Sequence, residues 1–525
     1  MQMKTRNLSK GGIHVANIDS TFLSSRFFAP VAVVAAAALV IGISGLVQVE
    51  KPKASEGAVS IEPIGSSVLL CPEPGTGGDL GVRVTAAVVP GQVGQDSGPG
   101  SAGIETLPGK ESASSPIKVP GEQGQIEAFG DRLPAIRAYG EGSLAPGLVA
   151  NQWGRDPSGR GRGMASTACA PAASEFWFVG GGAIAGRKTR VLLVNPDDTA
   201  ALVDVIIHGP DGIIDAPAGR GLVVPPLDRV TVQLDVLAPG VRAAALHILA
   251  RTGRIGASVN DEQRSGLQSV GTDWVPQAAL PARKVYVPGV INGLGARVLS
   301  IVSTSENDAN VTLRVISPEG TFEPAGSNVF TVTSGAVVTT DMTPDLPQTP
   351  DGSLPVTLEL TSDQPIVVGM RQFFGEKRVQ NETAFSAGAQ PITGPAAVSG
   401  LPVRDATDVR LAISAPEGDV EVDIVLLPFR GGKSVGEPTA PRRIKVTGGQ
   451  LRNIKLNPPT DIDWYTAIVT TVPGSGPVLL AHRVREKSRY GDLMTGYPWS
   501  PLRIEVSVPS AAQNEAVVVR RAATS

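Results

Sequence analysis

The sequence contains few of the residues on which catalytic and metal centres most often depend. Its 525 residues include four histidines and two cysteines, and aromatic residues make up 4% of the chain. The histidines are far apart in the sequence, at His14, His208, His247 and His482. Without a histidine cluster there is no HExxH motif and no evident general base for a nucleophile triad. We therefore predict a non-enzymatic protein with no catalytic residues, no metal site and no cofactor.

Two short strings match catalytic motifs but lack the structural context that those motifs require. Residues 432–436 read GKSVG, yet prolines follow where a nucleophile elbow needs a helix. Residues 115–118 read SPIK, which places a proline inside an S-x-x-K motif. We interpret both matches as chance. Two carboxylates from distant positions would leave no local motif, so a hydrolase with an unrecognised site stays as a second alternative function.

The chain also lacks an excess of charge of one sign. Charged residues make up 18% of the sequence and the formal net charge is −3. Without a basic surface there is little to attract a polyanion, so we expect no nucleic acid partner. Glycine and proline, with 61 and 44 residues, are abundant, which favours many short elements joined by turns.

One long apolar run lies near the N-terminus. Residues 27–47, FFAPVAVVAAAALVIGISGLV, carry no charge and would span a bilayer core of about 30 Å as a helix. Four basic residues and one acidic residue precede the run. The positive-inside rule then predicts a cytoplasmic segment 1–26, a transmembrane signal anchor 27–47 and an extracytoplasmic remainder, in a single-pass protein of the cell membrane. A cleaved signal peptide and a buried core helix are the alternatives.

The remaining sequence repeats at a spacing of about 110 residues. A strand that ends in a small residue recurs at Ala150, Ala257, Gly369 and Ala481, and a strand that opens each unit ends at Gly181, Gly289 and Gly400. Apolar and polar residues alternate within these runs, and turn residues separate them, as in antiparallel sandwiches. We therefore predict an all-β fold, with tandem immunoglobulin-like β-sandwich repeats in a row after the transmembrane helix.

The repeat pattern also gives domain boundaries. We expect repeat 1 at 57–153, a linker at 154–175, repeat 2 at 176–262, repeat 3 at 285–378, repeat 4 at 396–490 and a terminal β-hairpin at 504–521. Residues 91–122, rich in Gly, Ser and Pro, are expected to be a disordered insertion in repeat 1. The terminal hairpin either completes the sheet of repeat 4 or presents an edge to a partner.

Three groups of side chains are candidates for a structural or binding role. Cys71 and Cys169 favour one disulfide, because a zinc site would need further ligands. Basic residues in the glycine-rich stretch GRDPSGRGRGM either contact an anionic polymer or lipid headgroups, or belong to a solvated linker: Arg155, Arg160 and Arg162. Trp274 and Trp499 lie near the segments between repeats, where they either bind sugars or pack one repeat against the next.

Several segments together resemble a known family. They are SVLLCPEPG, ACAPAASEFWFVGGG, LLVNP and GTDWVPQAALP, in combination with the N-terminal apolar run. The chain resembles an uncharacterised actinobacterial family of membrane-anchored extracytoplasmic proteins with a domain of unknown function. This resemblance implies a location and an architecture, and it implies no active-site residues.

These observations lead to a functional expectation. We expect a non-enzymatic, membrane-tethered extracytoplasmic scaffold or adaptor of the bacterial cell envelope. Its partners would be the membrane, through the N-terminal helix, and an envelope protein or a cell-wall polymer. The alternative is a cell-wall polymer or carbohydrate binding protein. No oligomeric state follows from the sequence.

Overall fold

The computed structural model describes residues 59–72, 81–107, 114–128, 135–159, 161–291, 293–326, 328–347, 354–375 and 382–509. The chain divides into two compact units, one formed by Met1–Ser60 with Ser507–Ser525 and the other by Ile61–Val506. The described elements are β-strands apart from the four-residue helix α2 Leu234–Leu237 and the 3-10 helix η1 Pro217–Gly219. The prediction of an all-β fold is therefore confirmed.

The strands form where apolar residues alternate with polar ones. In β22, Val311, Leu313 and Val315 are fully buried, whereas Thr312 and Arg314 between them are exposed. Side chains alternate between the two faces of a strand, so this pattern buries one face of the sheet and leaves the other to solvent.

Module 1 comprises residues 66–171 and consists of two antiparallel sheets, with strand orders β10-β2-β7-β4-β5 and β6-β3-β8-β9. Its strands are β2 Ser66–Cys71, β3 Gly81–Val88, β4 Gly100–Thr106, β5 Ser114–Ile117, β6 Gln123–Ala128, β7 Ile136–Gly142, β8 Leu148–Asp156, β9 Gly163–Ala168 and β10 Ala170–Pro171. Apolar residues from both sheets form its core.

Module 2 comprises residues 175–275. Its sheets have the orders β11-β17-β13-β14, with β15 also paired to β13, and β16-β12-β18-β19. The strands are β11 Glu175–Gly181, β12 Arg187–Val194, β13 Ala201–Gly209, β14 Gly212–Ile214, β15 Leu222–Val224, β16 Arg229–Gln233, β17 Ala244–Thr252, β18 Gly256–Ser265 and β19 Gln268–Val275.

Module 3 comprises residues 282–387 and forms one eight-stranded sheet around the long strand β26. Residues 357–362 of β26 pair with β22 and residues 366–372 pair with β21, so this strand connects the two sides of the module. The strands are β20 Ala282–Ile291, β21 Arg297–Ser303, β22 Ala309–Ser317, β23 Gly320–Phe322, β24 Val329–Val332, β25 Val337–Asp341, β26 Pro355–Phe374 and β27 Glu382–Ala387.

Module 4 comprises residues 396–495. Its sheets have the orders β28-β34-β30-β31, with β32 also paired to β30, and β33-β29-β35-β36. The strands are β28 Ala396–Pro402, β29 Thr407–Ser414, β30 Val420–Arg430, β31 Lys433–Ser434, β32 Arg442–Val446, β33 Leu451–Lys455, β34 Trp464–Thr471, β35 Leu479–Glu486 and β36 Leu493–Thr495.

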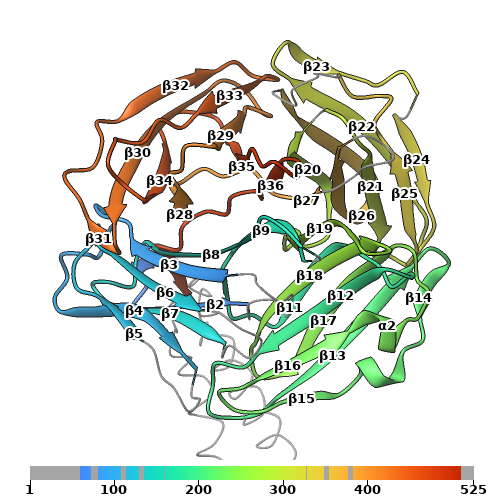
Figure 1. Cartoon of the computed structure of the whole chain (residues 1–525), viewed down its shortest axis with the longest axis horizontal. Coiled ribbons are helices and arrows are strands. Elements are labelled where there is room, and N and C mark those ends of the chain that lie inside the picture. Colours follow the sequence, from blue (N-terminus) through green and yellow to red (C-terminus); the bar gives the residue numbers. More distant parts are fainter. Residues whose placement is uncertain are drawn as a thin grey trace, which may run out of the picture. The chain divides into compact units, whose positions relative to one another are not determined.

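The four modules close into a ring rather than extending as a row. A strand at or near the end of each module contacts the corresponding strand of the next, in the order β9, β19, β27 and β36, and β36 contacts β9 again. Figure 1 shows these four strands near the centre of the unit formed by Ile61–Val506. Neighbouring cores also interlock, because Phe385 of module 3 joins the core of module 2, and Trp153 and Met164 of module 1 join that of module 4. Each module thereby buries apolar surface that a free end would expose to water.

Three of the glycines that revealed the repeat, Gly289, Gly369 and Gly400, lie where modules approach each other. A Cβ atom added to Gly369 would lie 2.3 Å from the carbonyl oxygen of Val179 in the neighbouring module. One added to Gly400, whose φ is +68°, would lie 2.2 Å from Oγ1 of Thr85. Both distances are too short for a real contact, so these glycines permit the close approach of neighbouring modules.

The structure corrects two of the expected segments. The presumed insertion 91–122 contains β4 and β5, because Ala102, Ile104 and Ile117 are buried in the core of module 1. The presumed linker 154–175 contains β9 and β10. Within the predicted terminal hairpin 504–521, β37 Glu505–Pro509 is a strand and pairs with β1 Val59–Pro63; residues 510–521 lie outside the described residues, so the hairpin stays a prediction.

The expected membrane localisation is also corrected. In the part of the chain that the structure describes, no helix is long and apolar enough to cross a membrane. The one described α-helix, α2, has four residues, far fewer than the roughly 20 that a bilayer core requires. The segments 1–26 and 27–47, on which the expectation was based, lie outside the described residues.

Candidate functional site

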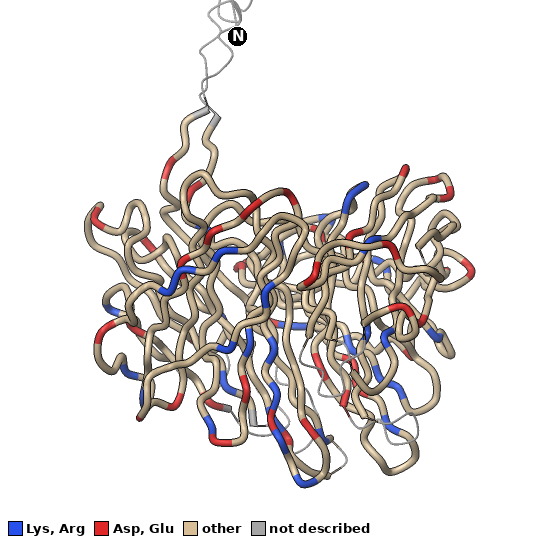
Figure 2. The backbone as a smooth tube through the Cα atoms, turned by 90° about the horizontal axis from the view of Figure 1, so that it is seen from above, with Lys and Arg blue, Asp and Glu red and all other residues tan. Residues whose placement is uncertain are grey.

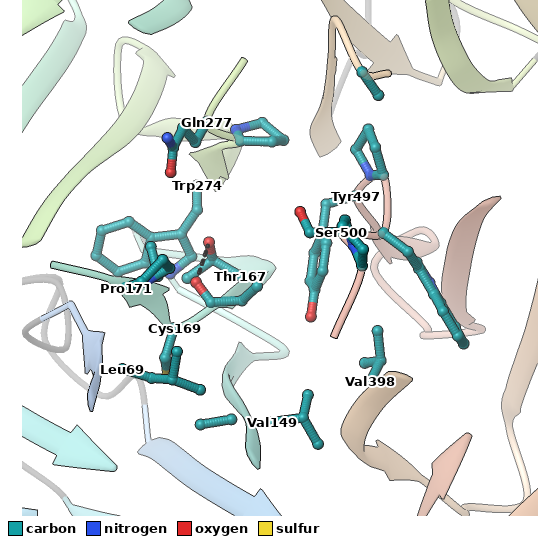
Figure 3. A pocket seen from close by; sticks show the side chains of 18 of the residues that line it. Leu69, Val149, Thr167, Cys169, Pro171, Trp274, Gln277, Val398, Tyr497 and Ser500 are labelled. Carbon is teal, nitrogen blue, oxygen red and sulfur yellow. Dashed lines mark hydrogen bonds between the residues drawn. The ribbon is translucent and has the colours of Figure 1, made fainter. Parts of the chain in front are cut away.

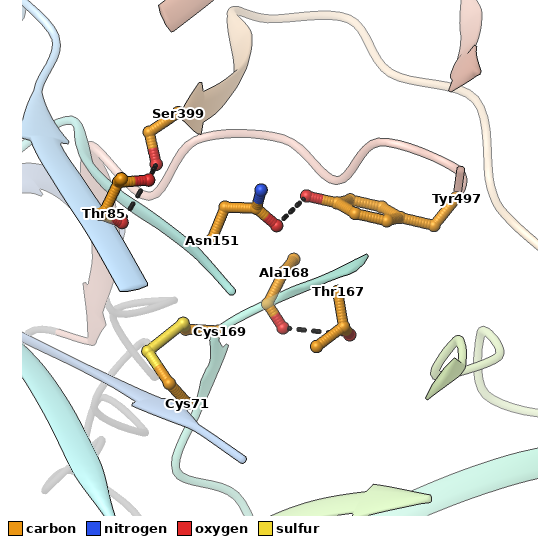
Figure 4. Close-up of a disulfide and its surroundings, with 8 residues drawn as sticks. All are labelled: Cys71, Thr85, Asn151, Thr167, Ala168, Cys169, Ser399 and Tyr497. Atoms are coloured by element: carbon orange, nitrogen blue, oxygen red, sulfur yellow. Dashed lines mark hydrogen bonds between the residues drawn. A yellow bond between two sulfur atoms is a disulfide. The ribbon is translucent and has the colours of Figure 1, made fainter. Parts of the chain in front are cut away.

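The predicted disulfide is present. Cys71 at the end of β2 and Cys169 directly after β9 form a disulfide with a Cα–Cα distance of 4.3 Å. It connects the two sheets of module 1 (Figure 4). Cys169 also lines the central cavity described below, so the disulfide fixes part of its wall.

Buried polar groups join the central strands of different modules. Asp273 of β19 is completely buried and accepts hydrogen bonds from Thr495 Oγ1 of β36, at 3.1 and 3.2 Å, and from the backbone N–H of Ser166 in β9, at 3.2 Å. One carboxyl group thus connects modules 1, 2 and 4. Burial raises the pKa of Asp273 well above its usual range, and the nearby charge of Glu382 raises it further.

A second buried carboxyl group lies on β27. Glu382 is completely buried and accepts hydrogen bonds from the backbone N–H groups of Thr383 and Met494, the latter in module 4. Burial raises its pKa well above the usual range, while the positive charge of Arg162 opposes that rise. Asp273, Glu382 and their partners hold the four central strands together.

The candidate arginines contribute to contacts between modules. Arg162 is buried and donates from Nη2 to the carbonyl oxygens of Gly491, at 2.6 Å, and Asp492, at 3.1 Å. Arg155 donates from Nε to both carboxylate oxygens of Glu486, at 2.7 and 2.9 Å. Both arginines therefore connect module 1 to module 4. Arg160 lies outside the described residues.

The two candidate tryptophans are almost fully buried at the centre of the ring. Trp274 and Trp499 are each 3% exposed, and both line the same cavity. Trp499 donates from Nε1 to Nδ1 of His482 at 3.1 Å, and burial lowers the pKa of that histidine to about 3. A neutral His482 is the acceptor that this hydrogen bond requires. The structure thus brings Trp274 and Trp499 together and places the arginines elsewhere in the ring.

The cavity at the ring centre has a volume of about 420 Å³ and is lined by residues of modules 1, 2 and 4 and of the segments that follow modules 2, 3 and 4. Module 1 contributes Leu69 and residues 148–150 and 167–171, and residues 388–390 follow module 3. Residues 257–258 and 274–279 lie in or after module 2, and residues 397–398 and 497–503 lie in or after module 4. Figure 3 shows Trp274, Thr167 and Pro171 on one side of the space and Tyr497 and Ser500 on the other. Small-molecule and peptide sites have comparable volumes.

The lining combines apolar rings with uncharged polar groups. Its prolines are Pro171, Pro276, Pro498 and Pro501, and its uncharged polar side chains include Thr167, Ser258, Gln277, Gln390 and Ser500. Arg503 is the single charged side chain among the described lining residues. Tyr497 is held in place because its hydroxyl group donates to Oδ1 of Asn151 at 2.7 Å (Figure 4).

Positively and negatively charged side chains are both spread over the rest of the unit formed by Ile61–Val506. Basic and acidic residues are interspersed along the chain in Figure 2. Among the described residues, no group of three or more His, Cys, Asp or Glu side chains is placed to hold a metal ion. The cavity is therefore the feature of the described chain best suited to bind another molecule.

Sequence reasoning missed several residues of this site, including Tyr497, Asn151, Asp273 and Glu382. One signal could have found the central strands, because a Thr-x-aromatic triplet recurs at residues 272–274, 383–385 and 495–497. The triplets lie on β19, on β27 and at the end of β36, and their aromatic residues are Trp274, Phe385 and Tyr497.

Comparison with known proteins gives a family and no function. The model of a family of unknown function, DUF5719, matches residues 125–456, which is more than half of the chain. No curated protein matches the chain significantly.

Proposed function

This chain belongs to DUF5719, a family of unknown function, and we propose that it is a non-enzymatic scaffold or adaptor that binds a partner protein in its central cavity. We infer in addition that its modules are immunoglobulin-like sandwiches, since antiparallel sheets with interdigitated apolar side chains are typical of that architecture. The observation that carries the proposal is the cavity itself, which is lined by residues of modules 1, 2 and 4 and of the segments after modules 2, 3 and 4, and which includes the exposed Gln277, Gln390 and Ser500.

The contacts between modules support a rigid role for the ring. Asp261 in module 2 is fully buried and accepts hydrogen bonds from Nε of Arg187 at 2.9 Å and from Thr189 Oγ1 at 2.6 Å. Arg371 of module 3 lies 3.1 Å from the same carboxylate. Buried pairs of this kind allow few alternative geometries, and a site preorganised in this way loses less entropy on binding.

A carbohydrate or cell-wall polymer is the second candidate partner. It is favoured by the four aromatic residues of the lining, Phe178, Trp274, Tyr497 and Trp499, because aromatic rings stack on sugars. Their low exposure argues against it, since the rings offer little free face for stacking.

Photo-cross-linking tests the proposal. The photoreactive residue p-benzoylphenylalanine is placed at Gln277, Gln390 or Ser500, exposed positions that line the cavity, and in a control at Leu267, which is 74% exposed in the turn after β18. We expect the cavity positions, and not Leu267, to form a defined adduct with a protein in cells that produce this chain. Adducts from Leu267 alone, or from none of the three cavity positions, would contradict the proposal.

A further inference from the structure

The buried carboxyl groups of Asp273 and Glu382 are bonded to strands that continue into the wall of the central cavity. Asp273 accepts hydrogen bonds from the backbone N–H of Ser166 in β9 and from the hydroxyl group of Thr495 in β36. Asp273, Ser166 and Thr495 are each followed within two positions by a residue that lines the cavity, respectively Trp274, Thr167 and Tyr497. A displacement of these strands is therefore transmitted along the backbone to the cavity wall.

The short strand β36 is bonded to both carboxyl groups. The hydroxyl group of Thr495 donates to Asp273, and the backbone N–H of Met494 donates to Glu382 at 3.4 Å. β36 has three residues and lies at the end of its sheet, where it pairs with β35. Residues 497–503, which line the cavity, follow β36 after one further residue. A change in either carboxyl group therefore acts on β36 and, through it, on this part of the wall.

Arg162 supplies the positive charge that acts on this pair of acids. Its charge opposes the rise in the pKa of Glu382, and its Nη2 donates to the carbonyl oxygens of Gly491 and Asp492. Other charged groups on the strands packed against the central four have partners of their own: Asp156 of β8 the backbone N–H of Ser158, Arg155 of β8 Glu486, Arg485 of β35 Asp492, Asp261 of β18 Arg187 and Arg371, and Glu262 of β18 Arg190. Arg162 is thus the opposing charge for two acids.

The two carboxyl groups also act on each other. Both are completely buried, and burial, reinforced by the charge of Glu382, raises the pKa of Asp273. Burial likewise raises the pKa of Glu382. One opposing charge stabilises one carboxylate, whereas a second carboxylate would add an uncompensated charge to a buried site, which is costly. The pair therefore keeps a proton up to a higher pH than an exposed carboxyl group does.

From these contacts we infer that Asp273 and Glu382 form a proton-controlled switch for the central cavity. When both carboxyl groups are ionised, their repulsion displaces β36 from β9, β19 and β27, residues 497–503 move with it, and the partner binds less tightly. Binding that is linked to one proton weakens by up to about tenfold per pH unit. This inference depends on the function proposed above, because it names the regulation of the same site.

The emission of an environment-sensitive fluorophore tests the switch without a partner. Acrylodan is attached to the full chain through Ser500→Cys, at an exposed position of the cavity lining, and in a control through Leu267→Cys, in the turn after β18. The chain's own two cysteines are joined in the disulfide and do not react. Between pH 5 and pH 9 we expect a reversible shift of the emission at position 500 and none at position 267.

Three variants assign the shift to the acid pair. Asp273→Asn and Glu382→Gln keep the shape of each side chain and an oxygen acceptor, but neither variant can hold two carboxylates at the axis, so each should abolish the shift. Asp423→Asn removes an acid that pairs with Arg443, whose side chain is 53% exposed, and should leave the shift unchanged. Circular dichroism at each pH distinguishes a local movement from unfolding.

Several results would overturn the inference. They are a constant emission at position 500, an equal shift at position 267, the same shift in both Asp273→Asn and Glu382→Gln, or a loss of the circular dichroism signal over the same pH range. The cross-linking adduct separates this inference from the proposed function. If the adduct from Gln277 forms equally at pH 5 and pH 9 in a cell lysate, the adaptor function stands and the switch is wrong. If the emission shifts and no adduct forms at either pH, the pH-dependent cavity stands and the adaptor function is wrong.

Discussion

The buried carboxylate of Asp261 offers a direct test of how the ring is held together. It is completely buried and pairs with Arg187 of its own module and with Arg371 of module 3. Asp261→Asn keeps the shape of the side chain and removes its charge, which leaves two buried guanidinium groups without a counter-ion. Removing one partner of a buried pair typically costs about 3–5 kcal/mol, so we expect a loss of that size in the free energy of unfolding.

A surface pair of the same chemistry provides the control. Asp423 accepts from Nε and Nη2 of Arg443 at 2.9 and 2.8 Å, but the side chain of Arg443 is 53% exposed. Exposed pairs contribute at most about 1 kcal/mol, so Asp423→Asn should have a small effect. Urea unfolding followed by circular dichroism measures both variants. Equal losses in the two variants would refute the reasoning that burial makes the Asp261 contacts important.

The pH dependence of the Asp261→Asn variant gives a second readout. Burial, together with the charge of Arg187, lowers the pKa of Arg371 to about 9. This pKa is lower than that of Arg371 in the unfolded chain, so above about pH 9 the unfolded state binds more protons than the folded state. The contribution of Arg371 to stability therefore rises with pH in that range. Without the Asp261 carboxylate the pKa of Arg371 should fall further, so the defect of the variant should become smaller as the pH is raised towards 9. A defect that grows with pH would contradict this account.

Three other predictions follow from the central strands and module 1. Burial raises the pKa of Glu382, so the stability that depends on its protonation is lost as the pH rises from about 4 through its folded pKa. Glu382→Gln should flatten this decline of stability with pH, measured by urea titrations, by up to about 1.4 kcal/mol per pH unit. An unchanged slope would contradict the prediction. Replacing Cys71 and Cys169 by serine opens a loop with a sequence separation of 98, and should lower stability by about 4–5 kcal/mol. An unaltered urea midpoint in non-reducing buffer would exclude that contribution. Tyr497→Phe leaves the buried amide oxygen of Asn151 unpaired, and the loss of about 1–3 kcal/mol should appear as a lower melting temperature; an unchanged melting temperature would contradict it.

The sequence by itself determined the class of the fold and the covalent bond that stabilises module 1. Strand formation follows from alternation between neighbouring residues, as at Val311 and Leu313, and this pattern is visible without any knowledge of the tertiary structure. Two cysteines allow one intramolecular pairing, so Cys71 and Cys169 could be matched by counting. The recurring small residues were also visible in the sequence, but the close approach between modules that some of them permit was not.

The tertiary structure alone decided that the modules form a ring and that a cavity lies at its centre. The central strands β9, β19, β27 and β36 all lie outside the four predicted repeats, and β9 was predicted to be part of a linker. Their burial comes from strands about 110 or more residues away, and no local pattern encodes such a contact. For the same reason Arg155 and Arg162 looked like a solvated loop, although they form contacts with module 4. Trp274 could be named as a candidate from its position, but its place in the cavity wall depends on distant residues such as Thr167 and Tyr497.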